Sequence, residues 1–141
     1  MRFMMFVRAD KNTEAGVLPS RDLVAAMGRF NAEMAKAGVL LAGEGIQPSA
    51  KGARVSFGRG TPTVANGPFP ANELVAGFWM IQVASKDEAI AWAKRVPFTA
   101  GEVVEIRQVF EASDFPPDVL PPEDAAREEA LREALRRNQA R

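Results

Sequence analysis

The sequence predicts an α+β fold, a ferredoxin-like antiparallel sheet with two helices on one face, followed by a C-terminal tail helix. A strand–helix–strand pattern occurs twice, over residues 2–42 and 77–110, with a hairpin between them. Right-handed crossovers would place both helices on the same side of one sheet. A Pro-rich segment follows, so we expect a domain over residues 1–112 and an appendage over residues 113–141.

The first repeat is marked by alternating apolar residues and by helix-end signals. Ser20 can cap the helix, and Gly38 suits the left-handed position that often ends one. The repeat comprises a strand over residues 2–8, a polar loop over 10–16, a helix over 19–38 and a short strand over 39–42.

The hairpin and the second repeat follow the same logic. Pro62 cannot donate a ladder hydrogen bond, so its strand is expected at an edge. Ser85 and Glu88 have capping-box spacing, and Pro97 ends the helix that they begin. The expected strands cover residues 53–57, 61–65, 77–84 and 102–110.

Large apolar residues also occur on the strand face that points away from the helices. The alternation of side chains along a strand places four such residues on this face: Met4 and Phe6 on the first strand, and Phe78 and Met80 on a later one. Soluble monomers rarely expose such a surface. We therefore expect a homodimer in which two sheets pack face to face.

The appendage begins with a Pro-rich linker over residues 112–122. A helix is expected over residues 123–141, because its acidic start and arginine-rich end complement the helix dipole. Leu131 and Leu135 are its only large apolar residues, so we expect a loosely docked or solvated tail helix.

Composition narrows the function classes. The 18 basic and 18 acidic residues balance, and no run approaches the roughly 20 apolar residues of a spanning helix. We expect a cytoplasmic protein that binds neither nucleic acid nor membrane. Cys, His and Tyr are absent, so catalysis would depend on other side chains, and neither a metal nor another cofactor is expected.

Three groups of residues are candidate sites. Asn66 and Phe69 belong to an Asn-Gly-Pro-Phe turn, which is either a turn only or one wall of a ligand cleft. The other two groups are charged. They comprise Glu44, Lys51 and Arg54, and Glu105, Arg107 and Arg8.

Each charged group has two interpretations. Lys51 and Arg54 could hold a carboxylate or phosphate, or could be solvated loop charges. Glu105 with Arg107 and Arg8 could form a structural ion-pair network or the polar floor of a cavity. A weak alternative pairs Ser49, as a nucleophile, with Lys51 as its base.

Together, these motifs resemble the YCII-related family, in particular its DGPF-motif branch. The resemblance covers roughly residues 1–112. The motif aspartate of that branch is Asn66 here, and the histidine of the His–Asp site described for other members is absent. The matching segments read Val64-Ala65-Asn66-Gly67-Pro68-Phe69, Gly77-Phe78-Trp79, Ser85-Lys86-Asp87-Glu88-Ala89 and residues 101–107.

The resemblance implies a dimeric α+β barrel with a cleft near the dimer interface. The first functional hypothesis is a homodimer that binds a small molecule, for example an anion. Its binding residues would be Asn66, Phe69, Lys51, Arg54, Arg8 and Arg107. The second is an enzyme with Glu105 or Glu44 as its general base. The third, implied by the family's link to sigma factors, is a regulatory interaction module that uses the tail helix.

Overall fold

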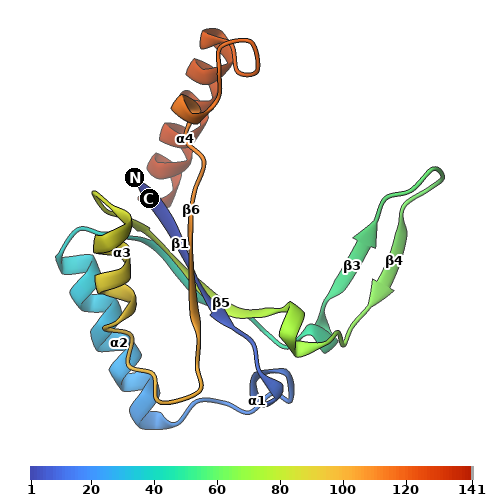
Figure 1. Ribbon diagram of the computed structural model, residues 1–141, viewed down its shortest axis with the longest axis vertical. Coiled ribbons are helices and arrows are strands. Elements are labelled where there is room, and N and C mark those ends of the chain that lie inside the picture. Colours follow the sequence, from blue (N-terminus) through green and yellow to red (C-terminus); the bar gives the residue numbers. More distant parts are fainter. Residues whose placement is uncertain (141) are drawn as a thin grey trace. The chain divides into compact units, whose positions relative to one another are not determined.

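The computed structural model describes residues 1–140, which form two compact units, Met1–Val109 and the segment from Phe110 onward. A four-stranded sheet forms the base of the first unit, with the order β2-β5-β1-β6 and every neighbouring pair antiparallel (Figure 1). This order confirms the ferredoxin-like α+β fold. The strands are β1 (Arg2–Arg8), β2 (Leu40–Gly45), β5 (Val75–Gln82) and β6 (Val104–Gln108).

Helices α2 (Arg21–Lys36) and α3 (Lys86–Ala93) both lie on one face of this sheet (Figure 1). Ser20 and Ser85 cap them, each accepting a hydrogen bond from a backbone N–H three residues later at 3.1 Å. Gly38 follows α2 with a φ of +76°, which confirms its expected left-handed conformation.

The hydrophobic core lies between the helices and the sheet. Met5, Met34 and Ile81 are fully buried there. Phe30 packs edge-to-face on Trp79 at 5.6 Å between ring centroids, and the Trp79 indole N–H donates to the Asn31 side chain at 2.8 Å. The one polar atom of this large ring is therefore satisfied inside the core.

The opposite sheet face, which we call the open sheet face, carries partly exposed apolar side chains in the centre and charged ones at its sides. The strand register aligns two rows of residues across the four strands. They are Glu44, Phe78, Phe6 and Glu105 in one row, and Ala42, Met80, Met4 and Arg107 in the next.

Strands β3 (Ala53–Ser56) and β4 (Thr63–Asn66) form a separate two-stranded hairpin between β2 and β5. We call residues 53–66 the arm. It projects on the side of the sheet opposite the helices (Figure 1), and all eight residues of its strands are exposed.

Two local expectations were wrong. Residues 10–16 are not simply a polar loop, because α1 (Lys11–Glu14) forms there with Asp10 as its cap. The Asp10 carboxylate accepts from the Thr13 N–H at 2.9 Å, a local bond that favours one helical turn. The strand expected over residues 39–42 begins at Leu40 and continues to Gly45, because β2 pairs with β5 along this length.

The second unit contains a short 3₁₀ turn, Ala112–Asp114, and helix α4 (Pro122–Gln139). Leu131 and Leu135 are more than half exposed on α4. Hydrogen bonds from Arg136 and its charge lower the pKa of Glu133, and the same contacts raise the pKa of Arg136. Helix α4 therefore carries ion pairs between turns of its own exposed surface.

Truncation of Met34 should measure how strongly the core stabilises the first unit. We expect Met34→Ala to lower the free energy of unfolding by about 2–5 kcal/mol, because it leaves a cavity among fully buried neighbours. Val24→Ala is the matched control, since Val24 lies on the same helix and is 56% exposed. Val24→Ala should change the free energy of unfolding by less than about 0.5 kcal/mol. The measurement is a urea titration followed by tryptophan fluorescence. Equal losses for both variants would contradict this assignment of the core.

Candidate functional site

An open hollow of about 340 Å³ lies at the root of the arm, and we call it the arm-root hollow. Its walls come from three parts of the first unit: α1, the segment from the end of β2 to Arg54 in the arm, and the segment from Phe69 to Val75 at the start of β5. The lining residues are Glu14, Ile46, Gln47, Pro48, Ser49, Lys51, Gly52, Ala53, Arg54, Phe69, Leu74 and Val75.

Ser49 holds these three parts together. Its hydroxyl donates to one oxygen of Glu14, and its backbone N–H donates to the other at 3.0 Å. The same hydroxyl oxygen accepts from the Phe69 N–H at 2.9 Å. The Ser49 hydroxyl both donates and accepts a hydrogen bond within the protein. Its contacts are therefore those of a residue that links three segments, not of a nucleophile activated by Lys51.

The turn at residues 66–69 packs directly against the backbone of Ser49. A Cβ atom on Gly67 would lie 1.8 Å from the Ser49 carbonyl oxygen, a distance that no side chain can occupy. The Gly67 N–H also donates to the Gly52 carbonyl at 3.0 Å. The glycine of the Asn-Gly-Pro-Phe turn is thus required by close backbone approach.

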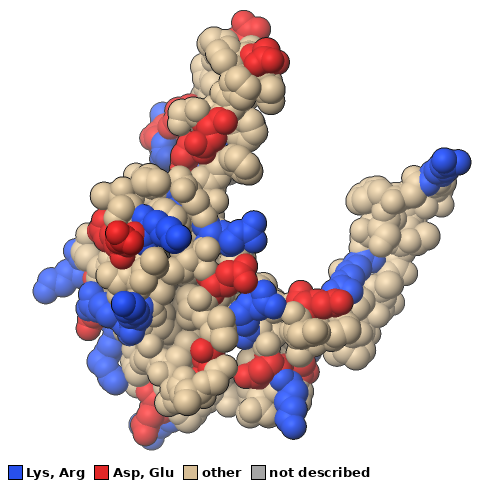
Figure 2. Space-filling model, viewed as in Figure 1, with Lys and Arg blue, Asp and Glu red and all other residues tan. Residues whose placement is uncertain are grey.

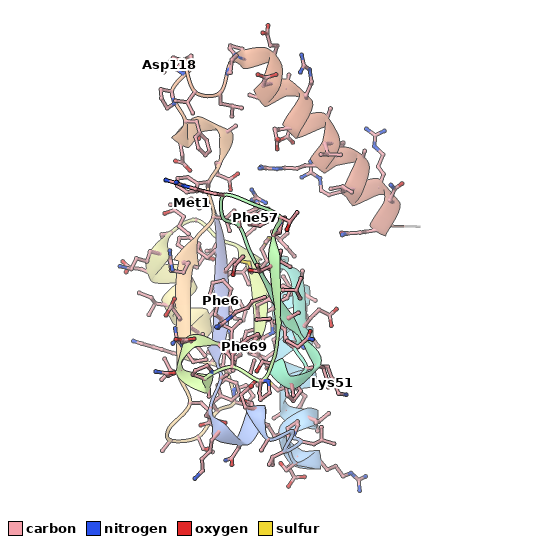
Figure 3. All side chains as sticks on the ribbon, turned by 90° about the vertical axis from the view of Figure 1, so that its right-hand side faces the viewer. Met1, Phe6, Lys51, Phe57, Phe69 and Asp118 are labelled. Carbon is pink, nitrogen blue, oxygen red and sulfur yellow. The ribbon has the colours of Figure 1, made fainter. Side chains whose placement is uncertain are left out.

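Two basic residues that were predicted as site residues, Lys51 and Arg54, line the hollow. The Arg54 guanidinium lies 4.0 Å from the ring centroid of Phe69 and pairs with Glu73 at 3.1 Å. Lys51 donates only a long 3.4 Å hydrogen bond to the neutral Gln47 side chain, and it forms no ion pair with any residue from 1 to 140. Figure 3 shows Lys51 and Phe69 at the same end of the arm.

The structure separates other residues that the sequence analysis grouped together. Asn66 is exposed and pairs with Ala53 in the arm, and it does not line the hollow. Glu44 lies on the open sheet face opposite Phe78 and likewise does not line the hollow that contains Lys51 and Arg54. Proximity in the sequence therefore grouped residues that the fold directs to different surfaces.

The third predicted group is one cluster at β1 and β6. One carboxylate oxygen of Glu105 forms a salt bridge with Arg8 at 3.1 Å, and the other forms one with Arg107 at 3.6 Å. Arg8 also donates to the Asn72 carbonyl at 2.8 Å. All three charged side chains are partly exposed, so the pairs are of the weakly stabilising surface type.

Glu14 is the residue that the sequence analysis missed. It is 35 positions from Ser49, and no spacing or motif connects the two. A second open hollow, of about 310 Å³, lies at α3 and β6 and contains none of the predicted site residues. Within residues 1–140, no group of three acidic side chains could hold a metal ion, and no helix is long and apolar enough to cross a membrane.

The sheet order and the two helices define a ferredoxin-like α+β domain that carries an inserted hairpin and an open hollow at its root. Residues 1–113 match the YCII-related domain, and the chain belongs to that family. No curated protein sequence shows significant similarity to the chain.

One solved structure that matches the chain is 5-chloro-2-hydroxyhydroquinone dehydrochlorinase from Burkholderia phenoliruptrix AC1100, in complex with 2,5-dihydroxybenzoquinone. The two sequences are 16% identical, the match covers 77% of this chain and 94% of the other, and the TM-score is 0.37.

Replacement of Gly67 tests the packing of the turn. We expect Gly67→Ala to destabilise the first unit by about 1–3 kcal/mol, because its Cβ would overlap the Ser49 carbonyl. The Phe69 amide should also exchange with solvent faster, since its bond to Ser49 would be displaced. Gly60→Ala is the control, because its Cβ would meet nothing within 4 Å. Unchanged stability and unchanged Phe69 exchange in Gly67→Ala would contradict this account.

Proposed function

We propose that the arm-root hollow binds a small organic anion with a flat apolar body. The observation that carries this proposal is Lys51, a cation without an acidic partner among residues 1–140, at the wall of a hollow that also contains Phe69. Small-molecule sites commonly combine apolar walls with a few placed polar groups. Ile46, Leu74 and Val75 provide further apolar wall here.

Among residues 1–140, the acidic groups near the hollow form no ion pair with Lys51. Glu14 directs both carboxylate oxygens at Ser49, and Glu73 is engaged by Arg54. Lys51 is therefore the cation that an incoming carboxylate or phosphate would meet first. The stacked Arg54–Phe69 pair offers an aromatic ligand one flat wall whose cation reinforces the attraction.

The turn at residues 66–69 supports membership of the DGPF-motif branch within the family. Gly67, Pro68 and Phe69 retain the motif, and Asn66 stands in place of its acid. A catalytic role receives less support, because the Glu105 oxygens already face Arg8 and Arg107. We therefore favour a binding function over base catalysis by Glu105.

We also propose that the protein is a homodimer in which two open sheet faces meet. Phe6, Phe78, Met4 and Met80 lie in the centre of this face and are partly exposed. Covering them would remove apolar surface from water at about 25 cal/mol per Å². The charged side chains at the sides of the face, among them Glu44 and Glu105, would then form the rim of the interface.

Benzoate is a suitable probe of the hollow, with uncharged benzamide as the chemical control. We expect benzoate to shift the backbone amide signals of Gly52 and Phe69 in NMR titrations, and benzamide to bind at least about fivefold more weakly, because it lacks the anionic group. Lys51→Gln should weaken benzoate binding by a similar factor. Arg59→Gln is the charge-matched control and should have little effect, since Arg59 does not line the hollow. Equal binding of both probes would contradict an anion site.

Dimerisation through the open sheet face can be tested separately. We expect Phe78→Asp to convert the dimer to a monomer in sedimentation equilibrium at micromolar concentration, because it would place a charge in the centre of the interface. Val24→Asp, on the exposed side of α2, should leave the dimer intact. A monomeric wild-type protein would refute the dimer without affecting the ligand proposal.

A further inference from the structure

The arm exposes an apolar side that the proposed ligand site does not use. Val55 and Val64 face each other across the two strands and are 54% and 64% exposed. Phe57, which continues the alternation of β3, is 83% exposed. Isolated two-stranded hairpins are marginally stable in water, so an apolar side on this one indicates a surface that is normally covered.

The other side of the arm has a different chemistry. Arg54, Ser56 and Thr63 alternate with the apolar positions, and Arg54 turns toward Phe69 at the root. The arm is therefore an amphipathic ribbon. Its polar side is suited to solvent, and its apolar side is suited to a protein surface.

The arm and the open sheet face lie on the same side of the first unit. The helices lie on one side of the sheet and the arm on the other (Figure 1), with open space between the arm and the domain (Figure 2). Viewed from the arm, Phe6 lies on the sheet behind it, and Phe57 lies toward the end of the arm opposite Lys51 (Figure 3). A molecule that covers the open sheet face would therefore also meet the arm.

The dimensions of the sheet suggest that the sheet face alone is a small interface. Four strands about 4.8 Å apart and about 20 Å long present on the order of 400 Å² of flat surface. Stable interfaces bury about 800 Å² on each partner. In a two-fold dimer, each arm that contacts the other copy adds area twice, because the contacts are reciprocal.

The distribution of charge also favours a second copy of this chain as the partner of the arm. Residues 51–66 contain Lys51, Arg54 and Arg59 and no acidic residue. Arg59 lies in the loop that joins β3 to β4, where the end of the arm is basic (Figure 2). On the open sheet face, Glu44 is exposed on edge strand β2 and forms no ion pair with the rest of residues 1–140. A second copy thus offers an apolar surface with an acidic edge to an apolar arm with a basic end.

We infer that each arm clasps a second copy of this chain, packing Val55, Phe57 and Val64 against the partner's sheet near the β2 edge. This inference rests on the proposed face-to-face dimer. In that arrangement each arm contacts the other copy and adds its apolar side to the interface. Both apolar surfaces on this side of the unit are covered by one symmetric contact.

Aspartate substitutions on the two sides of the arm provide the first test. Val64→Asp should raise the dimer dissociation constant by about tenfold or more, as at a buried interface position. Thr63→Asp is the matched control, because it adds the same charge to the adjacent residue on the polar side. It should change the constant by less than about threefold. Equal effects of the two variants would overturn the inference.

Cross-linking provides a second test that does not depend on the folding of an aspartate variant. The chain has no cysteine, so Gly58→Cys on the arm and Ala42→Cys beside Glu44 can be made as separate proteins. A Cβ at Gly58 meets nothing within 4 Å. After subunit exchange in a mixture, a bis-maleimide reagent should join the two positions, and mass spectrometry would identify the joined peptides.

The outcomes separate this inference from the dimer proposal. Cross-links between positions 58 and 42 in the mixture, together with weaker dimerisation of Val64→Asp, support the clasp. A dimer that is disrupted by Phe78→Asp but shows no such cross-link overturns the clasp and leaves the face-to-face dimer standing. A wild-type monomer overturns both.

Discussion

The coverage of the sheet on one face only is the constraint from which most features of this protein follow. Helices α2 and α3 bury one face, where Met5, Met34 and Ile81 exclude water completely. The opposite face presents a centre of partly exposed apolar side chains, and neither α2 nor α3 covers it. The helices of the first unit therefore cover one face of its sheet only. The apolar centre therefore creates a need for a second surface, and only the charged side chains beside it are suited to water.

The second organising contact is the tie at Ser49, which shapes the root of the arm. One hydroxyl links Glu14 and Phe69, and the carbonyl of the same residue lies where any side chain on Gly67 would have to be. These contacts hold Phe69 in the wall of the arm-root hollow, and Arg54 stacks on the Phe69 ring. The arm contributes only the first two residues of β3, Ala53 and Arg54, to the lining of the hollow.

Local patterns predicted most of the fold, because strands and helices leave period and capping signals in neighbouring residues. Ser20, Gly38 and Ser85 marked helix ends correctly for this reason. The candidate site was harder to predict from the sequence, because its contacts join segments that are far apart along the chain. Glu14 and Ser49 are 35 positions apart, whereas Glu44 and Lys51 are close in sequence yet occupy different surfaces. Charge and residue type identify candidates, but only tertiary packing decides which of them meet.

The contacts of the turn also explain how Asn66 can stand where the proposed DGPF motif has an acid. The contacts of the turn that touch the hollow are made by two other residues: Gly67 packs closely against Ser49 because it has no side chain, and Phe69 contributes its N–H and its ring. Asn66 contributes strand pairing with Ala53 through its backbone, which an amide and an acid supply equally. Position 66 also lies outside the wall of the hollow. The geometry of the turn is therefore compatible with a neutral residue at this position, and a binding function based on Lys51 and Phe69 does not require the acid.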